Sequence, residues 1–281
     1  MILVTGATGT IGRHLSKHLQ GRGAPFKAMV RSEAKGAALG CDYRLGDFDE
    51  PTSLVAAMEG IDTLFLNSPG GEILLRHQTA AIEAARRAGV RRIVKISSRG
   101  ADASSQMPIA RSHGLTEKLL AEAGLSWAVL RPGTFMQNLL RNATIVRSES
   151  KIYGAYKNGR ISFIDAEDIA ACAAELLLSD RHEGATYTLS GPEALSFAAI
   201  AEKLSAVLGK LVTYVDLPPE QMVEVLKSNG MPPPFAEMMV RLMVVFSSGD
   251  AAHVTPAVEE ISGRPARGLD VFLAENAAVF R

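Results

Sequence analysis

The stretch "VTGATGTIG", Val4–Gly12, places three glycines three residues apart, directly after the first apolar run of the chain and just before a helical pattern. Glycines in a turn between a strand and a helix allow a tight bend and a close approach of a ligand to the backbone. The N-terminus of the helix then faces that ligand with the positive end of its dipole. The turn therefore predicts a binding site for the pyrophosphate of a dinucleotide, although a glycine-rich turn that holds nothing remains the structural alternative. The residues that we expect to contact the ligand here are Gly6, Thr8, Gly9, Thr10, Ile11 and Gly12.

Short apolar runs alternate with longer helical patterns through the first half of the chain. Continuously apolar strands between helices are typical of a parallel sheet that is covered on both faces. The predicted strands are Ile2–Thr5, Phe26–Val30, Thr63–Asn67, Arg92–Ser97 and Trp127–Arg131. The predicted helices are Ile11–Gly21, Pro51–Met58, Leu74–Ala88 and His113–Ala123. This rhythm predicts an α/β fold with a doubly wound parallel sheet, the Rossmann type.

The rhythm becomes less regular after Arg131. We expect a strand over Ile161–Ile164, a helix over Ala166–Leu178, a strand over Thr186–Leu189 and a helix over Ser196–Leu208. We therefore predict a Rossmann domain over residues 1–190, with substrate-pocket insertions after residue 131. A smaller, mostly helical substrate lobe follows over residues 191–281. Its segment 231–246 is rich in methionine and phenylalanine, which suits a lid over varied ligands, a core or a dimer seam.

Composition excludes several classes of partner. The 30 basic residues balance the 30 acidic ones, so no net field attracts nucleic acid or an anionic membrane. Two cysteines are too few for a disulfide framework, and we expect a cytoplasmic protein that acts as a monomer or homodimer. His14 and His18 stand one helical turn apart, but no third ligand accompanies them, so no metal site is predicted.

The end of the second predicted strand indicates which dinucleotide is bound. An NAD-binding unit usually has an acidic residue there to hold the ribose 2′-hydroxyl group, whereas this chain has Arg31 in "AMVRSEAKG". A guanidinium can grip a 2′-phosphate with two hydrogen bonds, which favours NADPH. Nearby Glu33 leaves the use of NADH open, and a solvated cation is the structural alternative for Arg31. In "GDFDE", Asp47 and Phe48 are placed to meet the adenine amino group and face, although Asp47 is equally suited to cap the next helix.

Polar residues at the ends of the later strands are candidates for the nicotinamide end of the site. Asn67 and Ser68 follow the fourth strand, and Ser97 follows the next one. His113 is a candidate to donate to ribose hydroxyl groups or relay a proton, with Glu117 one turn further to orient it. Loop capping is the alternative for the first three residues and a satisfied or solvated histidine for the fourth. The cations Arg86, Arg87, Arg91, Arg92 and Lys95 are interpreted as complementing a helix C-terminus.

Residues after the last strand of the cofactor half suit a flat apolar substrate. They are Pro132, Phe135 and Met136, with Asn138 as a polar anchor. Ordinary core packing is the alternative for all of them.

These motifs together resemble the NmrA-like branch of the atypical short-chain dehydrogenase/reductase superfamily. The matching stretches are "VTGATGTIG", "VRS", "GDFDE", "LRPGTFMQN", "FIDAEDIA" and "TPAVEEISGRPARGLDVF", which together span nearly the whole chain. Within the branch, the sequence is similar to small bacterial reductases that pass hydride from NAD(P)H to quinones, azo dyes or triphenylmethane dyes. The family also contains proteins that bind NADP and regulate transcription without catalysis.

One departure from the superfamily pattern narrows the expected chemistry. Typical members carry a Tyr-x-x-x-Lys pair whose tyrosine protonates a carbonyl oxygen, but here Ile109 and His113 take those positions. The loss of a matched acid disfavours ketones. The resemblance therefore implies an NADPH-preferring reductase that passes hydride directly to a planar conjugated acceptor, with His113 and Ser97 as candidate catalytic residues. A protein that only senses NADP(H) is the competing class.

Overall fold

A seven-stranded parallel sheet is the centre of the first of two compact units in the computed structural model, which describes all residues 1–281. The strand order is β3-β2-β1-β4-β5-β6-β8, and each neighbouring pair runs parallel. The bounds are β1 Ile2–Val4, β2 Phe26–Val30, β3 Tyr43–Leu45, β4 Thr63–Leu66, β5 Arg92–Ile96, β6 Ser126–Pro132 and β8 Ala185–Leu189. The order reverses between β1 and β4, which is where doubly wound sheets bind their ligands. The predicted fold class is confirmed.

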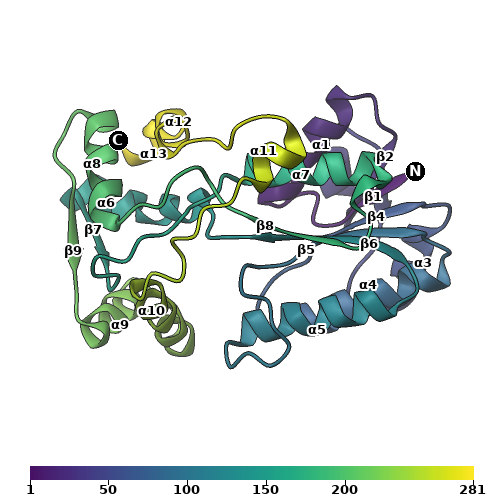
Figure 1. Cartoon of the computed structure of the whole chain (residues 1–281), viewed down its shortest axis with the longest axis horizontal. Coiled ribbons are helices and arrows are strands. Elements are labelled where there is room, and N and C mark those ends of the chain that lie inside the picture. Colours follow the sequence, from purple (N-terminus) through teal and green to yellow (C-terminus); the bar gives the residue numbers. More distant parts are fainter. The chain divides into compact units, whose positions relative to one another are not determined.

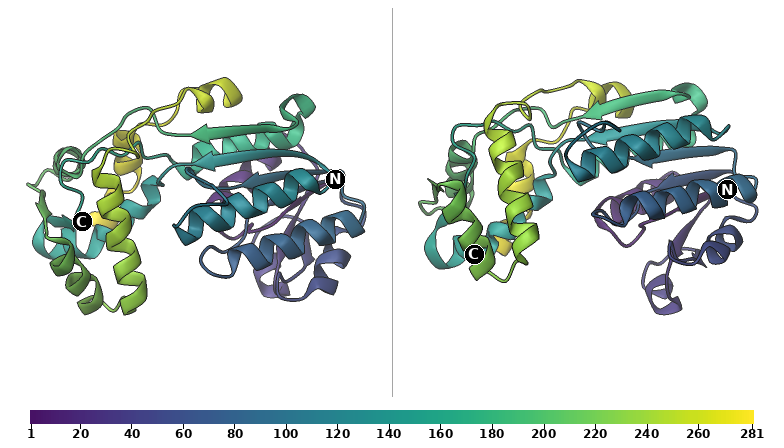
Figure 2. Two further views of the ribbon diagram at one scale, coloured as in Figure 1. Left: turned by 60° about the horizontal axis from the view of Figure 1, so that its bottom comes forward. Right: turned by 90° about the horizontal axis from the view of Figure 1, so that it is seen from below.

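Helices cover both faces of this sheet (Figure 1). On one face lie α1 Thr10–Gly21, α7 Ala166–Leu178 and α11 Ala257–Ser262, and on the other lie α3 Pro51–Met58, α4 Leu74–Arg87 and α5 Pro108–Glu122. The short elements α2 Glu33–Ala37 and η2 Asp180–His182 complete the unit. Figure 2 shows the same two layers from two further sides.

The strands are buried because these helices remove them from water. Every residue of β1 and β5 is buried, including the side chains of Leu3, Ile93 and Val94. Burying one such aliphatic side chain stabilises the fold by about 1.5–3 kcal/mol. The sheet is therefore a rigid base from which the strand ends project, and buried polar groups within it need a specific partner.

The second compact unit consists of residues 133–165, 190–256 and 265–281. Its two-stranded parallel sheet pairs β7 Lys151–Gly154 with β9 Thr213–Asp216. Its core includes a stack of Tyr156 on Phe197, whose ring centroids lie 4.0 Å apart. The remaining elements are η1 Met136–Asn142, α6 Ala143–Glu149, α8 Phe197–Leu208, α9 Pro219–Ser228, α10 Pro233–Ser247, α12 Leu269–Glu275 and α13 Ala277–Phe280.

The two units differ from the predicted division of the chain at residue 190. Residues 133–165 pack in the second unit, and residues 257–264 return to the first. The helix α11 returns because its side chains Val258 and Ile261 are buried, and it packs beside α7. A single boundary along the sequence cannot describe units that the chain crosses several times.

Two local predictions were wrong. Ile161–Ile164 forms no strand and makes only isolated bridges, from Ile161 to Leu195 and from Ile164 to Phe135. The helix predicted to start at His113 begins at Pro108, so His113 lies inside α5 rather than at its start. Proline is favoured in the first turn of a helix because its missing N–H group has no acceptor there. The helix predicted over Ala166–Leu178 has those bounds in the structure. None of the helices is both long and apolar enough to cross a membrane.

Candidate functional site

The glycine turn between β1 and α1 leaves no room for side chains. Gly6 has a φ of +64°, a conformation that favours glycine, and a Cβ on it would lie 2.9 Å from the carbonyl oxygen of Asn67. A Cβ on Gly12 would lie 2.3 Å from the carbonyl oxygen of Gly6, so this glycine allows the helix to pack against the turn. Gly9 is the N-cap residue of α1 and offers no side-chain cap.

The N-terminus of α1 carries positive potential that the protein itself does not neutralise. The first-turn N–H groups of a helix have no acceptors inside it, and α1 has no acidic residue in that turn. Thr8, Gly9 and Thr10 are exposed, while Ile11 and Gly12 are buried. The backbone N–H of Gly9 donates to the carbonyl oxygen of Gly6, so the donors left for a ligand are those of the first turn of α1, and such donors suit a phosphate group.

Thr5 and Asn67 join the turn to the end of the neighbouring strand β4. The Thr5 hydroxyl group donates to the carbonyl oxygens of Phe65 and Asn67, at 2.8 and 2.9 Å. The backbone N–H of Asn67 donates back to that hydroxyl group at 2.9 Å. The structure therefore places Gly6 and Asn67 side by side at the point where the strand order reverses.

Asn67 and Ser68 differ in how their side chains are used. The side-chain amide of Asn67 makes no hydrogen bond within the chain and lies beside Gly6, 3.1 Å from the position that a Cβ would take. The hydroxyl group of Ser68 donates to the carbonyl oxygen of Pro69 and accepts from Gln78, at 3.2 and 3.3 Å. Asn67 thus retains its hydrogen-bonding capacity for a ligand, whereas Ser68 is engaged by its own loop and by α4.

Arg31 directly follows β2 and is exposed. Its guanidinium forms no hydrogen bond or ion pair within the chain, so all five of its N–H donors remain available. This is the state that binding of a phosphate requires, and it is equally the state of a solvated cation.

Asp47 and Phe48 are used within the fold. Phe48 is buried in the core and stacks on His77, with ring centroids 5.2 Å apart and planes 15° from parallel. This packing leaves Phe48 as a core residue and not an open adenine platform. The carboxylate of Asp47 accepts from the backbone N–H of Asp49 at 3.1 Å, while the N-cap position of α3 belongs to Glu50. The alternative that Asp47 caps the helix was therefore wrong.

A buried pair of titratable side chains lies between β5 and α5. The Lys95 side chain is fully buried, and its Nζ lies 3.1 Å from Nδ1 of His113, which is 7% exposed. Burial lowers the pKa of Lys95 to about 7, with the charge of Glu117 opposing the shift and that of Arg131 adding to it. Burial and the nearby Lys95 lower the pKa of His113 to about 3, so the imidazole is neutral at physiological pH.

Glu117 is held by two other residues beside this pair. Its carboxylate accepts two hydrogen bonds from the guanidinium of Arg131, the one from Nε being 3.0 Å long, and a further one from the hydroxyl group of Ser97. Hydrogen bonding to Glu117 raises the pKa of Arg131. The expectation that Glu117 orients His113 was wrong, because its acceptor oxygens are engaged by Arg131 and Ser97. The Ser97 hydroxyl proton is likewise engaged, and the residue is buried.

Lys95 does not belong with the cations at the C-terminus of α4, so the prediction that grouped it with them was wrong. Arg86 and Arg87 do lie in the last turn of α4, but Lys95 lies inside β5 and points to α5. Arg92 is also buried, and it donates to the carbonyl oxygen of Ser179 and to Asp180. The available signal was a lysine within "RIVKI", an otherwise buried strand where a charged side chain needs a partner.

The predicted substrate residues fall in different environments. Pro132 ends β6 in the first unit. In the second unit, Met136 is 1% exposed within the core, which supports ordinary packing for this residue. Phe135 is half-buried and Asn138 is exposed, with the Asn138 backbone N–H donating to the carbonyl oxygen of Phe135. Phe135 and Asn138 remain predictions as substrate contacts.

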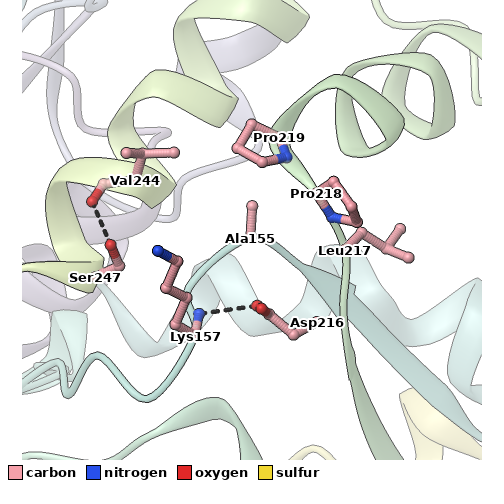
Figure 3. A pocket seen from close by; sticks show the side chains of 8 residues that line it. All are labelled: Ala155, Lys157, Asp216, Leu217, Pro218, Pro219, Val244 and Ser247. Carbon is pink, nitrogen blue, oxygen red and sulfur yellow. Dashed lines mark hydrogen bonds between the residues drawn. The ribbon is translucent and has the colours of Figure 1, made fainter.

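The methionine-rich segment lies on α10 and has two different faces. Met243 and Val240 belong to a small core cluster, whereas Phe235 and Met238 are exposed. One face is therefore core, and the roles of lid and dimer seam remain predictions for the other. Beside α10, the second unit has a hollow of about 380 Å³ (Figure 3). Its lining consists of Ala155, Lys157, Asp216, Leu217, Pro218, Pro219, Val244 and Ser247, and includes none of the predicted substrate residues.

His14 and His18 both lie against Glu167 of α7. The distances are 3.2 Å from His14 Nδ1 and 3.1 Å from His18 Nε2 to the carboxylate oxygens, and Arg264 adds a contact of 3.0 Å. No group of three or more metal-ligating residues occurs in the chain. The two histidines therefore tie α1 to α7.

Comparisons with known proteins show which proteins this chain is similar to. The family model described as NAD(P)H-binding matches residues 6–180. The NAD(P)H azoreductase of Xenophilus azovorans is 38% identical over 283 residues, which cover 100% of this chain and 99% of the relative.

Two solved structures extend the similarity to the whole fold. The NADPH-dependent quinone oxidoreductase of Escherichia coli, complexed with NADPH, has a TM-score of 0.91 at 31% identity and covers 99% of this chain and 100% of its own. The triphenylmethane reductase of Citrobacter sp., complexed with NADP(H), has a TM-score of 0.88 at 27% identity, with 99% of this chain and 100% of the relative covered.

Proposed function

Because this chain belongs to the NAD(P)H-binding, NmrA-like family, we propose that it is an NADPH-preferring reductase acting on a planar conjugated acceptor, a quinone or an azo dye. The observation that carries the proposal is the open glycine turn at the reversal of strand order, with the unpaired Arg31 at the end of the next strand. The full-length similarity to an azoreductase and a quinone oxidoreductase supports the choice of acceptor.

The residues present fit a dinucleotide. The closely packed Gly6 and Gly12 keep the turn clear of side chains, and the uncapped N-terminus of α1 offers backbone donors to the pyrophosphate. The free guanidinium of Arg31 suits a 2′-phosphate, and the unengaged amide of Asn67 suits the nicotinamide half. NADPH supplies the hydride when it is bound.

The protein's own contribution is positioning rather than acid catalysis by a tyrosine. The position of the superfamily tyrosine is taken by Ile109, whose side chain lies 4.0 Å from the point that a Cβ on Gly70 would occupy. Burial and the nearby Lys95 lower the pKa of His113 to about 3, so this residue does not serve as a cationic acid at neutral pH. An electron-poor conjugated plane fits this arrangement, because its reduced form is a delocalised anion or a neutral species that water can protonate afterwards.

The experiment that tests the proposal measures oxidation of NADPH and NADH by the purified protein. The acceptor panel contains quinones, azo dyes, triphenylmethane dyes and simple ketones, and cofactor binding is measured in parallel by calorimetry. We expect turnover of the conjugated acceptors but not of the ketones, with NADPH preferred. Tight NADPH binding without turnover of any acceptor would contradict the enzyme assignment and support a protein that senses the cofactor.

A further inference from the structure

The partners of Lys95 are unusual for a buried lysine. Its Nζ donates to the carbonyl oxygen of Ile96 at 3.2 Å and lies 3.1 Å from Nδ1 of His113, but it forms no ion pair. The nearby carboxylate of Glu117 is engaged by Arg131 and Ser97. A buried ammonium without a carboxylate partner is costly, so the fold tolerates it only where it has a specific contact to make. Of its two contacts, the one with His113 is the only one to another titratable side chain.

Hydrogen-bond chemistry fixes the direction of this contact. A lysine ammonium has three donors and no acceptor, whereas a neutral imidazole has one nitrogen that donates and one that accepts. With the ammonium beside Nδ1 of His113, Nδ1 must accept, and the ring proton must sit on Nε2.

The other ring nitrogen faces a different environment. Nε2 of His113 has no hydrogen-bond partner within the chain, and it is not among the fully buried atoms without partners. The residue is 7% exposed. The hydrogen that the tautomer places on Nε2 is therefore available to a ligand.

We propose that Lys95 is a positioning residue that holds the His113 ring and fixes its tautomer, so that the imidazole presents a neutral Nε2–H donor. The consequence for catalysis rests on the proposed function: a neutral donor can bind a cofactor hydroxyl group or an acceptor oxygen without adding charge to the site. The tautomer itself is a property of the protein alone. Its test is therefore separable from the test of reductase activity.

The contact between Lys95 and His113 predicts that the preference of His113 for one tautomer depends on pH. Burial lowers the pKa of Lys95 to about 7, the charges that act on it are those of Glu117 from α5 and Arg131 from β6, and the neutral His113 of α5 faces it. The deprotonated amine has a lone pair and can accept from Nδ1–H. As the pH rises through about 7, the preference for the Nε2–H tautomer weakens.

The experiment is nitrogen NMR of the full chain with ¹⁵N-labelled histidine. The His113 signals are assigned with His113→Gln, and His182, whose Nδ1 lies 2.8 Å from the hydroxyl group of Tyr187, is an internal reference outside the pair. Below pH 7 we expect the Nε2–H tautomer to exceed the Nδ1–H tautomer by about tenfold or more. A protonated Nδ1 at pH 6 in the wild-type protein would overturn the proposal whatever the variants show.

Two substitutions separate positioning from simple packing. Lys95→Met keeps the length of the side chain but removes every donor, so the two tautomers should become comparable and the pKa of His113 should rise. Lys95→Gln removes the titrating amine and replaces it with an amide that can donate to Nδ1 or accept from it, so the pH dependence of the tautomer near 7 should vanish. Lys118→Met, at an exposed position of α5, is the control. If both Lys95 variants keep the wild-type tautomer and its pH dependence, Lys95 does not position the ring.

Discussion

The glycine turn and the Lys95–His113 pair lie in the same unit but arise in opposite ways. The turn is a contiguous stretch whose proposed function depends on backbone groups and on glycines that carry no side chain. The pair joins residues from β5 and α5 that are 18 positions apart, and it depends on two side chains buried against each other. Motifs of the first kind can be found by inspection of a sequence, whereas the second kind appears only when the elements are packed.

The two regions also differ in their electrostatics. At the turn, uncapped N–H groups and the unpaired Arg31 create positive potential that remains open to a ligand. Beside the pair, the ion pair between Glu117 and Arg131 is satisfied within the protein, and the imidazole is kept neutral. We propose that the first region binds an anion and that the second offers a donor without charge, and substitutions can test this contrast.

Gly12→Ala should have the largest effect because the added Cβ would meet the backbone of the turn, 2.3 Å from the carbonyl oxygen of Gly6 and 2.6 Å from Cα of Ala7. A steric clash of this kind costs about 3 kcal/mol. If the turn changes shape to relieve the clash, the Kd for NADPH should rise by about a hundredfold. Thermal unfolding and calorimetric titration with NADPH measure the two effects.

Gly21→Ala is the matched control in the same helix, since a Cβ there has nothing within 4 Å. It should leave NADPH affinity unchanged and stabilise the protein slightly, because alanine is the better helix former. Equal NADPH affinities for the Gly12 variant and the wild type would show that the turn does not hold the cofactor.

Glu117→Gln should destabilise the first unit by about 2–3 kcal/mol, because it leaves the Arg131 guanidinium without its anionic partner. It should also lower the pKa of Lys95 further, since the charge of Glu117 raises it. Urea unfolding measures the first effect, and the pH at which the His113 tautomers exchange reports the second. Glu122→Gln, on an exposed position of the same helix, should change neither.

The sequence predicted the parallel sheet and the turn because both leave local signals: apolar runs, helix-capping residues and regularly spaced glycines. It did not predict the role of Lys95, because this residue of β5 follows a run of arginines in the sequence and was grouped with them. The contacts of Glu117 were missed for a related reason. Glu117 lies one helical turn after His113, which indicates that the two side chains share a face of α5. Arg131 of β6 binds the carboxylate of Glu117 instead, and the order of the strands, which the sequence does not show, brings Arg131 close to it.

Arg31→Ala should reduce NADPH affinity by about tenfold to a hundredfold, as expected for the loss of charge-assisted hydrogen bonds to a 2′-phosphate. NADH affinity should hardly change, because NADH lacks that phosphate group. The control is Lys35→Ala, which removes an exposed cation from the neighbouring helix α2. Calorimetric titration with both cofactors measures the change, and an equal loss for NADH and NADPH would mean that Arg31 does not read the phosphate.

Glu167→Gln should have the smallest effect at neutral pH and a larger effect in acid. It tests whether the contacts of α1 with α7 help to shape the glycine turn that precedes α1. Burial opposes ionisation of Glu167, but hydrogen bonds from His14 and Arg264, with the charges of His18 and Arg264, lower its pKa from 4.5 to about 2. A carboxyl group whose pKa is lower in the folded than in the unfolded state stabilises the fold above the unfolded value. That contribution is lost as the pH falls from about 4.5 to about 2.

As the pH falls from about 4.5 to about 2, the wild-type protein should therefore lose about 1–2 kcal/mol of unfolding free energy through Glu167, allowing for solvent screening. Glu167→Gln should remove this contribution to the pH dependence of stability. Urea unfolding at pH 6 and at pH 3 measures it, with Glu122→Gln as the control. NADPH titration at pH 6 then decides the structural question. Unchanged affinity in a destabilised variant means that the turn is shaped by its own glycines, and reduced affinity means that the contacts between α1 and α7 also shape it.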